Sequence, residues 1–348
     1  MKMIFVSAAL LMGFTVMAQD TTKKGNLVLS GSVDAYYRFN FANAKDSGRI
    51  NNLTSFTKSQ NSFELGMASV KADYSIGKAG AVLDLGFGRR AEEFSYNDAG
   101  TLAAIKQAYV TYAPTDKVKF TMGKWGTHVG YEMLDAYLNR NYSMSYMFSS
   151  GPFFHTGIKA DFAISKNFAF MAGISNPTDY TTASFEKKFF IGQIHLNTTD
   201  GKLGGYLNYV GGKDNSDNSI NQIDAVITGA ISGKFSVGYN GTIKSVKPAS
   251  GSGSSWYGSA LYLNFDPCSS FGLTARGEYL GDKDGVAGFG TNIFDATLSA
   301  NIKIGNLTII PELRLDASKD ALFYTNSDKL LPTAKNTGSF ILAATYHF

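Results

Sequence analysis

The amino-acid sequence contains few residues that could catalyse a reaction. After residue 18 its histidines are His128, His155, His195 and His347. No two of them are close enough in the sequence to suggest a pair of metal ligands, and the sequence contains no Gly-x-Ser-x-Gly turn that would expose a nucleophilic serine. We therefore predict no catalytic residue and no enzyme. One alternative stays open: a barrel hydrolase needs only a Ser and a His that face each other, and His128, His155 or His195 would then be required for activity on lipid.

Three further patterns resemble ligand-binding motifs only in part. Residues 229–234 (GAISGK) are one residue short of a phosphate-binding loop, and Phe235 stands where that loop needs a hydroxyl. Residues 282–285 and 214–218 are rich in Asp but lack the twelve-residue calcium loop with its closing Glu. Cys268 is the only cysteine, so it forms neither an internal disulfide nor a cysteine zinc site. We predict no cofactor and no metal site, and loose binding of calcium or of lipopolysaccharide-bridging cations at the Asp-rich loops stays open.

Charged residues instead recur at every second position of apolar segments. In residues 27–41, Asp34 and Arg38 lie on one face of an extended strand, while Val33, Ala35 and Tyr37 lie on the other. The same alternation places further charges opposite apolar rows near the end of the chain: Arg276, Glu278, Glu312, Arg314 and Asp316. Polar side chains within a membrane strand require a wet or internally paired interior, so the pattern predicts a hydrated barrel lumen.

The alternating segments are separated by connections that are short and long in turn. The short ones fall at 77–80, 113–117, 165–167, 199–202, 232–234, 266–269 and 305–306, and the long ones at 42–60, 95–102, 126–152, 177–186, 213–219, 247–254, 282–291 and 319–336. These fifteen connections predict an all-β fold: a transmembrane antiparallel β-barrel of about sixteen strands, with short periplasmic turns and long extracellular loops. A change of phase between Ser62 and Ile76 predicts a β-bulge near Ala68.

Both ends of the chain are consistent with this fold. Residues 1–18 combine an early Lys with an apolar stretch and a small-residue cleavage site, which predicts a signal peptide for export. We predict that residues 19–348 then form a single barrel domain in the outer membrane of a Gram-negative bacterium. The last strand carries an apolar row that ends on Tyr346 and Phe348, which we expect to be the signal read by the barrel-assembly machinery. With 32 basic and 28 acidic residues the charge is near balance, so no nucleic-acid partner is expected.

Residues 126–152 form a long connection that is too aromatic for a free external tip. We hypothesise that it folds into the lumen and narrows it, with Glu132, Asp135 and Arg140 opposite wall charges such as Arg38, Arg276 and Arg314. Packing at the barrel rim is the alternative. The complete set of predicted pore-lining or constriction residues is Asp34, Arg38, Lys124, Tyr131, Glu132, Asp135, Arg140, Arg276, Glu278, Glu312, Arg314 and Asp316.

The central stretch from Lys106 to Asp179 contains four short motifs in a fixed order. They are a Gly-Lys-aromatic step at Gly123, Lys124 and Trp125, a Gly-Tyr-Glu loop at Gly130, Tyr131 and Glu132, an Asn-Tyr-Ser segment at Asn141, Tyr142 and Ser143, and a Pro-x-x-His-x-Gly entry to the next strand at Pro152, His155 and Gly157. In this order the stretch resembles the OmpL-like β-barrel porin family, and segments 276–285 and 312–316 are similar to the family's C-terminal pattern. The likeness covers most of residues 19–348. Trp125 and Met144 stand where the family often has Phe and Arg.

The resemblance implies an outer-membrane porin. We predict a water-filled channel for passive diffusion of small hydrophilic solutes or ions, surrounded by outer-membrane lipids and able to form a homo-oligomer. The alternative is a non-conducting barrel that serves as a surface adhesin or receptor, whose lumen would be occluded by loops.

Overall fold

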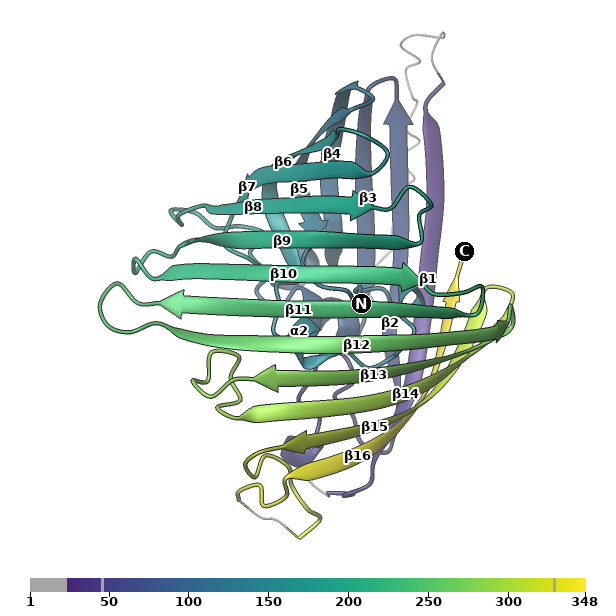
Figure 1. Ribbon diagram of the computed structural model, residues 1–348, viewed down its shortest axis with the longest axis vertical. Helices are drawn as coiled ribbons and strands as arrows, with labels where there is room; N and C mark the ends of the chain where they lie inside the picture. The colour runs from purple at the N-terminus through teal and green to yellow at the C-terminus, as the bar shows by residue number, and fades with distance from the viewer. Residues whose placement is uncertain (1–23, 45–46, 328–329) are drawn as a thin grey trace, which may run out of the picture.

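Residues 24–44, 47–327 and 330–348 are described by the computed structural model, in which sixteen antiparallel strands close into one barrel (Figure 1). Each strand pairs with its neighbours in sequence, and β1 pairs with β16 to close the wall. The strands are β1 (Asn26–Asn40), β2 (Ser62–Ile76), β3 (Ala79–Phe87), β4 (Ile105–Thr115), β5 (Val118–Gly126), β6 (Phe154–Ala163), β7 (Phe168–Ser175), β8 (Phe189–Asn197), β9 (Leu203–Lys213), β10 (Ser219–Ala230), β11 (Phe235–Lys247), β12 (Ser254–Cys268), β13 (Phe271–Gly281), β14 (Asn292–Ile304), β15 (Leu307–Ser318) and β16 (Asn336–His347). The predicted fold and strand number are confirmed.

The connections alternate as the sequence predicts. At one end of the barrel, tight turns join β2 to β3, β4 to β5 and each later even-numbered strand to the strand that follows it. Gly77, Gly201 and Gly305 lie in these turns with positive φ, a conformation that glycine adopts without steric cost. The longer connections at the other end contain α1 (Arg89–Phe94), α2 (Tyr146–Ser149) and the 3-10 segments η1 (Ser47–Arg49), η2 (Gly100–Ala104) and η3 (Ala136–Leu138). No helix among the described residues is long and apolar enough to cross a membrane.

Side chains alternate between the outer and inner faces of the wall. On β16, Leu342 and Tyr346 are exposed on the outer face, while Ile341 and Ala343 are buried on the inner face. Exposed Leu, Ile, Val, Phe and Tyr residues recur on the other strands in the same way. An apolar outer surface of this kind is what a barrel presents to lipid.

The predicted bulge lies on β2, but two residues earlier than expected. Asp34 and Ala35 on β1 pair with Met67 and Leu65, so Gly66 is the extra residue. The bulge predicted near Ala68 is thus present. Glycine suits position 66 because a Cβ there would clash with the carboxylate of Asp34.

The two ends of the described chain meet at the seam of the barrel. The backbone N–H of Gly31 donates to the carbonyl of Phe348, and the N–H of Phe348 donates to the carbonyl of Gly31, both at 3.0 Å. In Figure 1 the purple β1 and the yellow end of the chain accordingly lie side by side. The predicted signal peptide, residues 1–18, lies outside the described residues.

Candidate functional site

The connection between β5 and β6, residues 127–153, crosses the inside of the barrel, and we call it the inner loop. The N–H of Gly130 donates to Asp224 of β10, the amide of Asn141 to Ser299 of β14, and the hydroxyl of Tyr142 to Asp34 of β1. These three strands occupy separate parts of the wall. A segment that contacts all three with inward-facing side chains must pass through the lumen.

Carboxylates hold the backbone of the inner loop. Glu312 of β15 accepts the N–H groups of Tyr142 and Ser143 at 2.7 and 3.1 Å. Glu278 of β13 accepts those of Tyr146 and Met147, both at 2.7 Å. Each carboxylate has two oxygens that accept hydrogen bonds without donating one, so each is suited to a pair of adjacent N–H groups.

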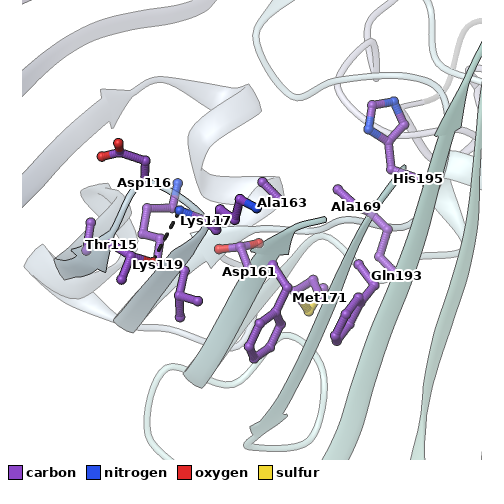
Figure 2. Close-up of a pocket in the computed structure, with 14 residues that line it drawn as sticks. Thr115, Asp116, Lys117, Lys119, Asp161, Ala163, Ala169, Met171, Gln193 and His195 are labelled. Atoms are coloured by element: carbon purple, nitrogen blue, oxygen red, sulfur yellow. Dashed lines mark hydrogen bonds between the residues drawn. The ribbon is translucent and has the colours of Figure 1, made fainter. Parts of the chain in front are cut away.

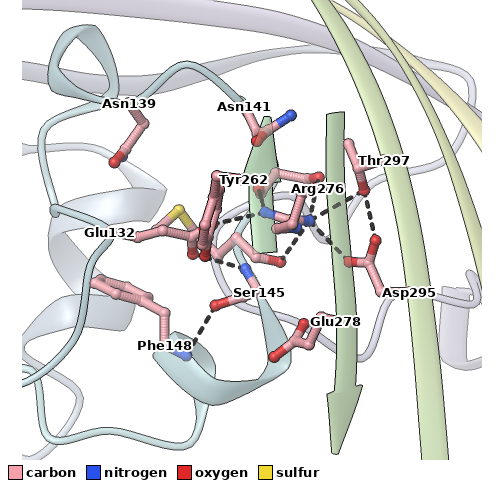
Figure 3. A network of polar contacts seen from close by, with 12 residues as sticks. Glu132, Asn139, Asn141, Ser145, Phe148, Tyr262, Arg276, Glu278, Asp295 and Thr297 are labelled. Carbon is pink, nitrogen blue, oxygen red and sulfur yellow. Dashed lines mark hydrogen bonds and ion pairs between the residues drawn. The ribbon is translucent and has the colours of Figure 1, made fainter. Parts of the chain in front are cut away.

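Arginines bind the carbonyl groups of the same segment, and Figure 3 shows the surroundings of one of them, Arg276. Arg276 of β13 donates to the carbonyl of Ser143, and Arg314 of β15 to that of Met144, each at 2.7 Å. Arg276 also pairs with Glu132 of the inner loop at 2.7 Å and with Asp295 of β14 at 2.8 Å. The wall thus satisfies both donors and acceptors of a backbone that makes no strand ladder, as buried peptide groups require.

Further ion pairs attach the inner loop and the neighbouring connections. Lys106 of β4 contacts Asp135 at 2.6 Å and Asp84 of β3 at 3.0 Å. Arg140 contacts Asp266 at 2.8 Å near the end of β12. Three further ion pairs involve predicted pore-lining residues: Lys124 with Asp98 at 2.8 Å, Arg90 with Asp34 at 3.8 Å, and Arg314 with Asp316 at 2.8 Å.

The predicted partners of the inner loop are found only in part. Glu132 lies opposite Arg276, as expected, but Asp135 and Arg140 pair with Lys106 and Asp266. Arg38 donates to carbonyl groups of the first long connection, residues 50, 51 and 59, and so holds a different segment. Sequence reasoning missed Lys106, Asp84, Asp266 and Asp295. Asp84 and Asp295 alternate with apolar neighbours, and this pattern could have identified them. At Lys106 a β-bulge interrupts the alternation, so the same pattern is not visible.

Aromatic and aliphatic side chains fill the space around these polar contacts. Tyr146 and Met147 pack with Trp256, Tyr262 and Leu280 of the wall. A second cluster contains Phe56, Phe94, Met144, Phe153 and Phe154. Tyr131 stacks on Tyr262, with ring centroids 4.2 Å apart. The inner loop is therefore packed within two apolar clusters rather than free in the lumen.

His128 and His155 lie together, although sequence reasoning found no close pair. Their ring centroids are 4.9 Å apart, whereas His195 stacks on Tyr206 at 4.3 Å. His128 contacts the Tyr209 carbonyl, and His155 contacts the hydroxyl of the neighbouring Thr127. Burial lowers the pKa of His128, in the inner loop, to about 4, so its imidazole is neutral near pH 7. Neither contact involves a serine.

In the two Asp-rich loops, aspartate carboxylates accept hydrogen bonds from backbone N–H groups of the same loop. Asp282 accepts the N–H groups of Ala287, Phe289 and Gly290, and Asp214 accepts those of Ser216 and Asn218. Among the described residues, no group of three or more His, Cys, Asp or Glu side chains is arranged to hold a metal ion.

Three cavities inside the barrel bear on this site. Two of about 140 and 130 Å³ flank the inner loop, and both include Glu132 in their walls. A third, of about 360 Å³, lies against the inner face of β4 to β8 near the tight turns, with Lys119, Asp161, Gln193 and His195 in its wall (Figure 2). The largest of the three spaces is thus on the side of the wall away from the carboxylate and arginine contacts.

A family model described as "Putative beta-barrel porin-2, OmpL-like" matches residues 26–348. The chain belongs to this family. The match spans every strand of the barrel, and it confirms the resemblance seen in the central stretch. No curated protein sequence matches the chain.

Solved structures with the same fold include several outer-membrane porins and channels. The anion-selective porin from Comamonas acidovorans has a TM-score of 0.62 at 11% identity, over 93% of this chain and 100% of that one. The outer-membrane channel DcaP of Acinetobacter baumannii has a TM-score of 0.64 at 10% identity, over 93% and 97%. The trimer form of OmpT of Vibrio cholerae has a TM-score of 0.59 at 13% identity, over 93% and 99%.

Family membership and fold together identify a porin-like barrel of the Gram-negative outer membrane. The expectation that the chain has no enzymatic activity stays a prediction.

Proposed function

We propose that the protein is a passive channel for small hydrophilic solutes and that the inner loop narrows its lumen. The observation that carries the proposal is the attachment of the inner loop to widely separated strands through Asp34, Asp224, Glu278 and Glu312. A segment fixed in this way keeps one position in the lumen, and a rigid constriction determines which solutes pass.

Deletion of residues 131–147 tests this function. Single-channel conductance in planar bilayers should increase in the deletion variant, because the removed segment occupies the lumen. The barrel should still close, since the β1–β16 and β5–β6 ladders do not include these residues. Unchanged conductance in a correctly folded variant would contradict the constriction.

A non-conducting barrel is the second candidate, and the packing of the interior favours it. Arg276, Glu278, Tyr142 and Tyr146 are almost completely buried within the barrel. An adhesin or receptor with a filled lumen would show no conductance after reconstitution. Wild-type conductance with solute-dependent block would instead support the channel.

We further propose export through residues 1–18, recognition of Tyr346 and Phe348 by the barrel-assembly machinery, and a homo-oligomer in the outer membrane. Similarity to an outer membrane protein solved in a trimer form, OmpT of Vibrio cholerae, supports the last point. Native mass measurement of the detergent-solubilised protein tests it, and a single-chain mass would contradict it.

A further inference from the structure

The ion-pair network around Arg276 and Arg314, which holds the inner loop, is not available to a hydrated ion. The side chains of Arg276 and Asp295 are completely buried, and that of Glu132 is 5% exposed. Arg314 and Asp316 are similarly enclosed. Each of these charges has an oppositely charged partner within 3 Å. Ion preference must therefore come from other charges on the inner surface.

Such charges lie in the large cavity against β4 to β8. Lys119 of β5 and Asp161 of β6 are directly opposite each other in register, on the face away from the exposed, outward-facing Met122 and Ile158. Asp161 pairs with Lys159 of its own strand at 3.2 Å. Lys119 is exposed in the cavity wall, and the structure records no ion pair for it within the described residues. Lys119 thus adds a second positive charge to a region in which Asp161 already pairs with Lys159.

The rim around this cavity is basic as well. Each of the five tight turns from β2–β3 to β10–β11 contains one exposed lysine, whereas only two of these turns contain an aspartate. The lysines are Lys78, Lys117, Lys166, Lys202 and Lys234, and the aspartates are Asp116 and Asp200. Like charges gathered at the mouth of a low-dielectric wall attract counter-ions toward it.

We infer that solutes enter the barrel from the tight-turn end through the cavity against β4 to β8 and that this entrance favours small anions, with Lys119 as the main selectivity residue. This inference rests on the proposed channel function. The β4–β8 side holds the largest of the three inner cavities described above, while the inner loop is bound mainly to strands on the opposite side. In the cavity wall Asp161 is balanced by Lys159, and Asp116 is accompanied by Lys117 in the adjoining turn, so Lys119 gives this region an excess of positive charge.

Reversal potentials in a potassium chloride gradient across a planar bilayer test the inference. The wild-type protein should favour chloride over potassium. Lys119→Glu should lower the chloride-to-potassium permeability ratio by about two- to fivefold, more strongly at low salt, because a charge near water is screened over about 10 Å at 0.1 M. Lys119→Arg should keep the wild-type ratio, and Lys119→Gln should give an intermediate value.

Lys283→Glu is the matched control, since it makes the same charge change on an exposed loop at the other end of the barrel. It should leave the permeability ratio unchanged. Lys119 is exposed, so the variants should fold, which heat-dependent migration on gels verifies. A conducting wild type without chloride preference, or a Lys119→Glu ratio equal to wild type, would overturn the inference. Absence of wild-type conductance would contradict the proposed function itself.

Discussion

Glu312 lies on an inward-facing position of β15 and accepts two backbone N–H groups of the inner loop and the hydroxyl of Ser299. Glu278 accepts two N–H groups in the same way further along the inner loop, at Tyr146 and Met147. Alternation alone predicts that such residues face the lumen, but a lumen-facing carboxylate can meet water, an ion or a peptide group. Here it meets peptide groups, and its primary effect is on the position of the inner loop.

Glu312→Gln should release this part of the inner loop. A glutamine offers one acceptor oxygen in place of two and directs an N–H group toward another donor, which costs about 1–3 kcal/mol at a buried position. Hydrogen exchange at residues 142–147, followed by mass spectrometry, should become faster. Glu92→Gln, an exposed change on α1, is the control. Equal protection in wild type and Glu312→Gln would show that the carboxylate does not hold the loop.

At the scale of elements, the β1–β2 bulge links the wall to the inner loop. Gly66 leaves room for the carboxylate of Asp34, which accepts the hydroxyl of Tyr142 and lies 3.8 Å from Arg90. The bulge thus allows two strands, the inner loop and α1 to meet at one point.

Gly66→Ala should therefore destabilise the barrel. The added methyl group would clash with Asp34 in a fully packed environment, and overpacking of this kind costs about 1–3 kcal/mol. The urea midpoint of the detergent-folded protein should decrease. Gly277→Ala on β13 is a matched control, because a Cβ there meets no atom within 4 Å. If both variants unfold at the wild-type midpoint, the packing argument at Gly66 is wrong.

At the scale of the whole molecule, closure depends on residues that are about 300 positions apart. The seam pairs β1 with β16 from Ser32–His347 to Asn40–Ser339, and the Gly31–Phe348 hydrogen bonds extend it. Strand closure removes free edges, which is the condition for a sheet to exist in lipid.

Removal of residues 346–348 should reduce the amount of folded barrel in the outer membrane, because it shortens the seam and deletes the predicted assembly signal. Cell fractionation with heat-dependent gel migration measures this amount. Phe348→Tyr, which keeps an aromatic end and the backbone pairing, should behave nearly as wild type. Undiminished assembly of the truncated protein would exclude a role for these residues.

The sequence by itself determined the barrel class, the strand number and the inward or outward direction of residues such as Asp34, Arg276 and Leu342, because side chains in a strand alternate with a period of two. Tertiary structure decided the partners: Asp135 with Lys106, Arg140 with Asp266, and His128 beside His155. These contacts join segments distant in sequence, and local periodicity carries no information about which distant segments meet. For the same reason, the sequence does not distinguish the charges that hold the inner loop from Lys119. Only the folded molecule shows that Lys119 remains exposed to the lumen.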